Sequence, residues 1–199
     1  MQKPSGYEEA KVQGGFIPVE LGGHKMSIRK VTETKSKNGD DMIVVEFDFA
    51  ADDVQPAYFA NQYESDTRAD KKWSNQATEY IMVNDYQDKT KTSSAFKTFT
   101  TCVEHSNTGF ETKWGIKDWG NQFVGKKIGG VFGEQLDFYN GKETKKRILR
   151  WFCSLDKVAD AVIPNTVESK AYKNRPQTEV NADGFMNIPD GIDEELPFN

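Results

Sequence analysis

The feature that most constrains this chain is an Asn140-Gly141 dipeptide between two long segments of mixed apolar and polar residues. Asn-Gly is typical of a two-residue β-hairpin turn, because both residues adopt positive φ at little cost. Such a turn places Tyr139 opposite Lys142 and sets the register of every pair behind it. The sequence from residue 126 to residue 155 therefore predicts one long antiparallel hairpin.

A second hairpin is predicted closer to the N-terminus. The segments 24–34 and 42–50 alternate apolar and polar residues, and Asn38-Gly39 lies between them. Alternation of this kind is typical of strands with one buried face. The second segment is expected to present four apolar side chains on one face: Ile43, Val45, Phe47 and Phe49. A third strand is predicted at residues 78–83.

One principal helix is predicted at residues 92–106, before the long hairpin. Its apolar residues recur at helical spacing: Phe96, Phe99, Cys102 and Val103. A serine at position 93 or 94 can accept hydrogen bonds from the first turn, and Asn107 with Gly109 ends the helix. A short helix is expected at residues 156–162, and a long, partly mobile connection at residues 52–75.

This order of elements predicts a mainly β fold with one principal helix. Five strands, with the helix between the third strand and the last pair, fit an OB-fold-like Greek-key barrel with extended hairpins. Glycines at positions 125, 129, 130 and 133 suit strands that bend sharply or approach other backbone closely. A β-sandwich is the alternative. We expect a domain at residues 14–173, a flexible segment at 1–13 and a disordered acidic tail at 174–199.

The charge of the chain is divided unequally along its length. The formal net charge is −5, but six of the 31 acidic residues lie from Gln177 onward, where there is no Lys or Arg. Residues 1–176 therefore carry a balance of +1. The acidity belongs to the tail, and it does not exclude an anionic partner for the preceding domain.

The register of the long hairpin predicts two different faces. The expected core face carries Ile128, Phe132, Leu149, Trp151 and Cys153, with a Glu134–Arg147 pair farther out. The expected outer face carries Val131, Gln135, Lys146, Ile148, Arg150 and Phe152. Lysines on a solvated strand can simply protect an edge against aggregation. The same mixture of basic and aromatic groups is what sequence-tolerant binding of single-stranded nucleic acid requires.

Further basic and aromatic residues extend this hypothesis to other segments. Stacking on aromatic rings contributes about 1–3 kcal/mol per base, and phosphate neutralisation adds a salt-dependent share. The predicted nucleic-acid-binding residues are Arg29, Lys30, Lys35, Lys37, Tyr58, Phe59, Tyr63, Lys71, Lys72, Trp73, Tyr139, Lys145, Lys146, Arg147, Arg150 and Phe152.

Catalytic and metal-binding motifs are not found in the sequence. His24 and His105 lie far apart, and no Cys-x-x-Cys, His-x-x-x-His or Walker-type motif occurs. We therefore predict no enzyme, no catalytic residues, no metal and no cofactor. Cys102 and Cys153 are expected to be reduced thiols, because no secretory signal precedes them. No apolar run of about 18 residues predicts a membrane span, so the expected location is the cytoplasm.

The last ten residues, DGIDEELPFN, suggest a partner-binding tip. An acidic run before Leu-Pro-Phe resembles the C-terminal tip of bacterial single-stranded-DNA-binding proteins. That resemblance implies that Asp193, Glu194 and Glu195 meet a basic rim on replication or recombination proteins, while Leu196, Pro197 and Phe198 fill an apolar pocket. Asn199 departs from the pattern, because it moves the terminal carboxylate one residue outward.

The body of the chain resembles a family of phage-encoded proteins, some treated as single-stranded-DNA-binding proteins with an OB-fold. The similar segments are GGHKMSIRKVTETKSKNGDDMIVVEFDFA, FKTFTTCVEHSNTGF, GKKIGGVFGEQLDFYNGK and VIPNTVESKAY. The resemblance implies sequence-non-specific binding of single-stranded DNA in phage DNA replication or recombination. The alternative is a non-enzymatic phage structural or adaptor protein that binds another protein. A monomer or a homo-oligomer fits the sequence equally.

Overall fold

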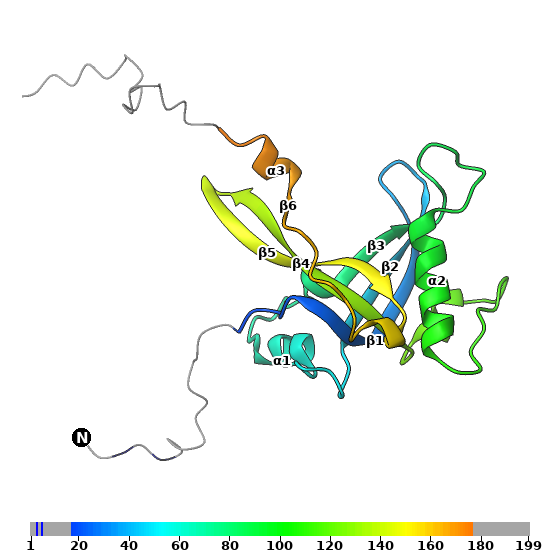
Figure 1. The fold of residues 1–199 in the computed structure, drawn as a ribbon, viewed down its shortest axis with the longest axis horizontal. Helices are drawn as coiled ribbons and strands as arrows, with labels where there is room; N and C mark the ends of the chain where they lie inside the picture. Colours follow the sequence, from blue (N-terminus) through cyan, green and yellow to red (C-terminus); the bar gives the residue numbers. More distant parts are fainter. Residues whose placement is uncertain (1–2, 4, 6–16, 177–199) are drawn as a thin grey trace, which may run out of the picture.

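A computed structural model describes residues 3, 5 and 17–176 of the protein (Figure 1). The predicted flexible segment at 1–13 lies almost wholly outside the described residues. The predicted docking tip, Asp193 to Phe198, also lies outside them, as does the acidic tail from residue 177 onward. Residues 174–176 are described, and Arg175 donates from Nε to the Glu143 carboxylate over 2.7 Å. The described domain therefore continues slightly past the expected boundary at residue 173.

The described chain is mainly β with one long helix, as predicted. The strands are β1 (Gly22–Lys35), β2 (Asp41–Phe49), β3 (Thr78–Met82), β4 (Lys127–Tyr139), β5 (Lys142–Cys153) and β6 (Val167–Glu168). The α-helices are α1 (Tyr58–Ser65), α2 (Ser94–Ser106) and α3 (Lys170–Lys173). Short 3-10 turns are η1 (Asn75–Ala77), η2 (Trp119–Phe123) and η3 (Leu155–Lys157).

The strands form a single sheet in the order β3-β2-β1-β4-β5. All neighbours on this path are antiparallel, and the short β6 pairs with β4 in parallel. Helix α2 connects β3 to β4 and packs against β4 and β5. Figure 1 shows the outer half of the β4–β5 hairpin projecting away from the sheet on the side opposite α2, with β6 and α3 beside it.

The first hairpin forms as predicted, although a β-bulge at Arg29 interrupts the regular alternation of β1. Val45 lies opposite Val31, and Ile43 pairs with Ile81 on the next strand. The four apolar side chains predicted on one face of β2 are all buried. They pack in a continuous core in which the Phe47 ring lies 6.2 Å from Phe132 and 6.4 Å from Phe152. Burial of such aromatic area is the main stabilising contribution in a fold of this size.

The long hairpin has the predicted turn, but a β-bulge reverses the expected faces near its base. Tyr139 pairs with Lys142, and both turn residues have positive φ. Phe132 pairs with Leu149, whereas the residue before it, Val131, pairs with Trp151. Arg150 is the extra residue of the bulge. Because side-chain direction alternates along a strand, one inserted residue inverts every assignment beyond it.

The predicted faces at Trp151 and Phe152 are therefore wrong. Trp151 was expected in the core but is 46% exposed. Phe152 was expected on the binding face but is only 7% exposed, and its ring lies 5.5 Å from that of Phe99 on α2. The glycine expectation holds at Gly130, opposite Phe152. A Cβ at this position would lie 2.4 Å from Cε of Met26, so only glycine fits without displacement.

The connection at residues 52–75 contains a helix that the sequence analysis missed. Helix α1 buries Phe59 completely. Its first amides are capped from a distant strand, because Asp48 accepts hydrogen bonds from Phe59 N at 2.9 Å and Ala60 N at 3.0 Å. A cap that comes from β2 leaves no local motif in the sequence.

Three short elements near the C-terminal end of the described chain also differ from the prediction. The short helix expected at 156–162 is only the 3-10 turn η3. The short strand β6 and the short helix α3 were not predicted.

Helix α2 begins and ends close to the predicted positions. Ser93 is its N-cap and accepts from Phe96 N over 3.1 Å. Asn107 is its C-cap, and its side-chain amide donates to Val103 O over 2.7 Å. Phe99 and Val103 are fully buried, as their spacing predicts. The helix thereby covers one end of the core.

Candidate nucleic-acid interface

The sheet leaves a gap between its two ends, which we call the seam. One side of the seam is η1 with β3, and the other side is β5. Among the described strands, β3 pairs with β2 and β5 pairs with β4, with no ladder between β3 and β5. Gln76 donates from Nε2 to Arg147 O over 2.8 Å and joins the two sides. This hydrogen bond therefore crosses the seam, and a cavity lies on each side of it.

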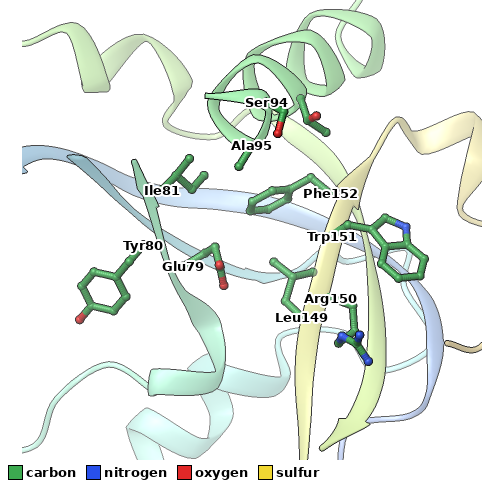
Figure 2. A pocket seen from close by; sticks show the side chains of 10 residues that line it. Glu79, Tyr80, Ile81, Ser94, Ala95, Leu149, Arg150, Trp151 and Phe152 are labelled. Carbon is green, nitrogen blue, oxygen red and sulfur yellow. The ribbon is translucent and has the colours of Figure 1, made fainter. Parts of the chain in front are cut away.

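A cavity of about 200 Å³ lies in the upper part of the seam, between β3, β5 and the first turns of α2 (Figure 2). Figure 2 shows Leu149 and Phe152 beside the gap on β5, with Glu79 and Ile81 facing them from β3. Tyr80 and Trp151 point away on opposite sides. The cavity combines apolar walls, aromatic neighbours and one carboxylate, and we call it the β3–β5 cavity.

Tyr80 and Trp151 are the exposed aromatic groups of the seam. Tyr80 is 61% exposed, although it lies in the middle of a strand. Tyr80 is not among the predicted binding residues, and Trp151 was predicted in the core. Alternation could have identified Tyr80, since its neighbour Ile81 occupies a buried position. For Trp151 there was no such signal, because its direction depends on the bulge at Arg150.

A second cavity of about 600 Å³ lies on the other side of the Gln76 bridge. Lys145, Lys146 and Arg147 line it, so the structure does bring these predicted residues together. Each has an acceptor within the protein. Lys145 Nζ lies 3.1 Å from a Glu134 oxygen, Lys146 pairs with Asp137, and Arg147 donates to the carbonyl of Val19.

The pairing of Lys146 with Asp137 has an electrostatic consequence. The hydrogen bond from Lys146, with a second from Ser169, lowers the pKa of Asp137 to about 2. Asp137 is therefore ionised at neutral pH and partly neutralises the lysine. An exposed ion pair of this kind is weak and screened by salt. A phosphate can accordingly compete for Lys146 at small cost.

Arg150 is displaced to the outer side of β5 by the bulge. Its Nη1 donates to Asn165 O over 3.0 Å. This bond ties β5 to the segment that precedes β6. Arg150 also lines the β3–β5 cavity, so a basic group lies at its edge.

A separate cluster gathers four predicted residues from three segments, at the outer side of β1 and α1. The guanidinium carbon of Arg29 lies 4.4 Å from the Trp73 ring centroid, and Lys71 Nζ lies 4.6 Å from that of Tyr63. The Tyr63 and Trp73 rings are 5.8 Å apart. Such cation–π contacts orient a cation over an aromatic face. Arg29 also pairs with Glu46 on β2.

The remaining predicted residues fall into three groups. Lys30, Lys35, Lys37, Lys72 and Tyr139 are exposed. Phe59 and Phe152 belong to the core, so their selection as exposed base-stacking residues is corrected: Phe59 is fully buried, and Phe152 contributes only to the wall of the β3–β5 cavity. Tyr58 packs its ring 5.8 Å from Phe49 and donates its hydroxyl to Ile17 O over 2.6 Å. It supports the N-terminal segment.

The described part of the chain contains no group of three or more His, Cys, Asp or Glu side chains placed to hold a metal ion. None of the helices within residues 17–176 is long and apolar enough to cross a membrane. No protein-family model matches the chain, and no curated protein matches it in a sequence search.

Proposed function

We propose that the protein binds single-stranded DNA without strict sequence preference, as a non-enzymatic factor in phage DNA replication or recombination. The observation that carries the proposal is the seam. Its exposed aromatic groups, Tyr80 on β3 and Trp151 on β5, flank the β3–β5 cavity together with Arg150. Lys145 and Lys146 lie farther along β5, at the second cavity. Rings that accept any base, next to cations that track phosphates, are the components of this type of binding.

The strand order supports an OB-type barrel. Strands in the order β3-β2-β1-β4-β5, with a helix between β3 and β4, fit a five-stranded Greek-key barrel that is partly open. In that fold, oligonucleotides bind on the face of strands 2 and 3 and on the loops that join strands 1 to 2 and 4 to 5. Tyr80 lies on β3, and the turn at Asn140-Gly141 joins β4 to β5.

The second part of the proposal concerns partner recruitment. The acidic residues Asp193 to Glu195, followed by Leu196, Pro197 and Phe198, would bind replication or recombination proteins, with the charges at a basic rim and the apolar groups in a pocket. Deleting residues 190–199 should leave DNA binding intact or stronger and should abolish partner capture. Weaker DNA binding by the truncated protein would contradict this role of the tip.

A titration with oligo(dT), followed by tryptophan fluorescence at two salt concentrations, tests the main proposal. We expect quenching, since Trp151 lies at the seam. The logarithm of the binding constant should fall linearly with the logarithm of salt concentration. Absence of binding at low salt, or equal affinity for duplex DNA, would refute the proposal.

A protein-binding adaptor is a second candidate, and one observation favours it. Trp114 is 62% exposed and stacks on the buried Trp119, with ring centroids 5.6 Å apart. These two residues line a cavity together with Ile116. Exposed Trp residues that stand in apolar surroundings are common in protein interfaces. If the oligo(dT) titration shows no binding at low salt, the adaptor becomes the preferred function.

A further inference from the structure

Glu79 occupies an inward position of the sheet. It pairs with Val45 on β2, a fully buried residue, and the next inward residue of β3, Ile81, is also buried. Glu79 is partly buried there. An inward position beside a valine ordinarily takes an apolar side chain, since a carboxylate loses part of its hydration at such a position. The carboxylate at this position therefore calls for a functional explanation.

The protein provides no partner for this carboxylate among the described residues. Glu79 has no hydrogen bond and no ion pair within residues 17–176. Burial raises its pKa to about 7. The other titratable or charged residues that line the β3–β5 cavity are Tyr80 from β3 and Arg150 from β5, and the guanidinium of Arg150 is held at Asn165. Helix α2 contributes Ser94, Ala95 and Thr98, which carry no charge.

The surroundings of Glu79 suit a flat ring with a polar edge. Phe152, Leu149 and Ile81 supply apolar surface around a space of about 200 Å³. In Figure 2 the Glu79 side chain points into the gap between β3 and β5. A planar heterocycle in this gap would contact apolar side chains with its faces and present its edge to the carboxylate. Arg150 at the rim can meet the phosphate that follows.

We propose that the β3–β5 cavity takes one unstacked nucleobase of the bound single strand and that Glu79 selects a base with an exocyclic amino group. This inference rests on the proposed binding of single-stranded DNA. A carboxylate accepts hydrogen bonds but donates none when ionised, and it is a known partner of the cytosine N4 amino group. Uracil has the same ring with a carbonyl oxygen at that position, which the carboxylate repels. The protein thus adds a modest base preference to an otherwise sequence-tolerant interaction.

Oligo(dC) and oligo(dU) of equal length test the proposal, because the two bases differ at the group that faces Glu79. The full-length protein is titrated at pH 8, where the carboxylate is ionised, and binding is measured by fluorescence anisotropy of a labelled strand. We expect roughly three- to tenfold tighter binding of oligo(dC), the size of a single charge-assisted hydrogen bond after its hydration cost.

The Glu79→Gln variant should lose this preference. Its amide offers both a donor and an acceptor, so it can pair with cytosine or with uracil. The control is Glu168→Gln, which removes one exposed carboxylate on β6 and should keep the wild-type ratio. Urea unfolding of both variants verifies that they are folded.

Each outcome decides between the two proposals. Equal binding of the two oligomers by the wild type overturns the base preference but leaves single-strand binding in place. A preference that survives in Glu79→Gln shows that another residue discriminates, and it also overturns the inference. If neither oligomer binds at low salt, the proposed function itself fails, and the inference with it.

Discussion

The side-chain amide of Gln76 donates to the backbone carbonyl of Arg147 over 2.8 Å, although 71 residues separate the two in the sequence. This hydrogen bond ties η1 to β5 at the point where the sheet does not close on itself. It also separates the β3–β5 cavity from the larger cavity beside Lys145 and Lys146. The Gln76 side chain therefore helps to hold the two sides of the seam together.

Gln76→Ala should loosen the seam without unfolding the domain. We expect a loss of about 1 kcal/mol in the free energy of unfolding, because one hydrogen bond is removed and the carbonyl can reach water. Urea unfolding measures this loss. Faster amide exchange in β3 and β5 than in β1 would locate the change at the seam, whereas uniform exchange across the sheet would contradict it.

Tyr80→Ala and Trp151→Ala should each weaken binding of oligo(dT) by about 1–3 kcal/mol, the range for loss of one base-stacking platform. Tyr80→Ala should change stability little, because that ring is 61% exposed, whereas Trp151→Ala also removes some packing, since Trp151 is 46% exposed. Tyr86→Ala is the matched control. Tyr86 is 86% exposed between β3 and α2, and its loss should leave the dissociation constant unchanged. A larger effect at Tyr86 than at Tyr80 would place the interface elsewhere.

Glu79 should make the protein less stable as the pH rises. Burial raises the pKa of Glu79 to about 7, above the unfolded value of 4.5. The folded state therefore holds more protons between these values, and this contribution to stability is complete below about pH 4.5 and lost as pH rises through about 7. Glu79→Gln should remove the decline and stabilise the protein by about 1–2 kcal/mol at pH 8 relative to wild type. Urea unfolding at pH 5 and pH 8 measures the difference between the two proteins.

The buried pair of His24 and Asp53 should make the protein less stable as the pH falls. His24 Nδ1 lies 2.8 Å from Asp53 Oδ1, and the same carboxylate accepts from the backbone amides of Lys25 and Gln55. Burial alone would raise the pKa of Asp53, but these hydrogen bonds lower it overall. Their contribution is therefore present above the unfolded pKa of 3.8 and lost as pH falls toward the lower folded value.

Asp53→Ala should destabilise the protein by about 3–5 kcal/mol at pH 7, since it leaves a buried imidazole and two amides without their acceptor. Thermal unfolding at pH 7 and pH 3 checks both the size and the pH dependence. The Asp52→Ala variant is the control, because Asp52 pairs with Lys25 and Lys127 at the surface. A loss at Asp52 as large as that at Asp53 would argue against the buried pair as the cause.

Local patterns predicted the parts of the fold that local physics determines. The turn at Asn140-Gly141 gave the pairing of Tyr139 with Lys142, and alternation gave the buried face of β2. The start of α2 followed from a serine cap one residue before it. Each of these features depends on residues that lie close together in the sequence, and the structure confirms them.

The candidate site was harder to predict, because it depends on contacts between distant segments. Arg29 reaches Trp73 across 44 positions of the chain, and α1 takes its cap from Asp48 on β2. No local pattern contains these pairings. The largest error came from the bulge at Arg150. The prediction assumed that side chains alternate between the two faces along all of β5, but the pairing of β5 with β4 shifts by one residue at Arg150. Of the two large aromatic residues of β5, the sequence pattern predicted Phe152 at the surface and Trp151 in the core, and the structure has the reverse.

The bulge at Arg150 also explains why β5 tolerates a change in length at this one position. If Arg150 were paired as in a regular strand, alternation from Leu149 would turn Trp151 inward and Phe152 outward. Deletion of Arg150 instead keeps the pairs Val131–Trp151 and Gly130–Phe152, so the indole stays at the surface and the phenyl ring stays in the core. Arg150 is therefore the residue of β5 that can be lost without moving either aromatic ring to the other face.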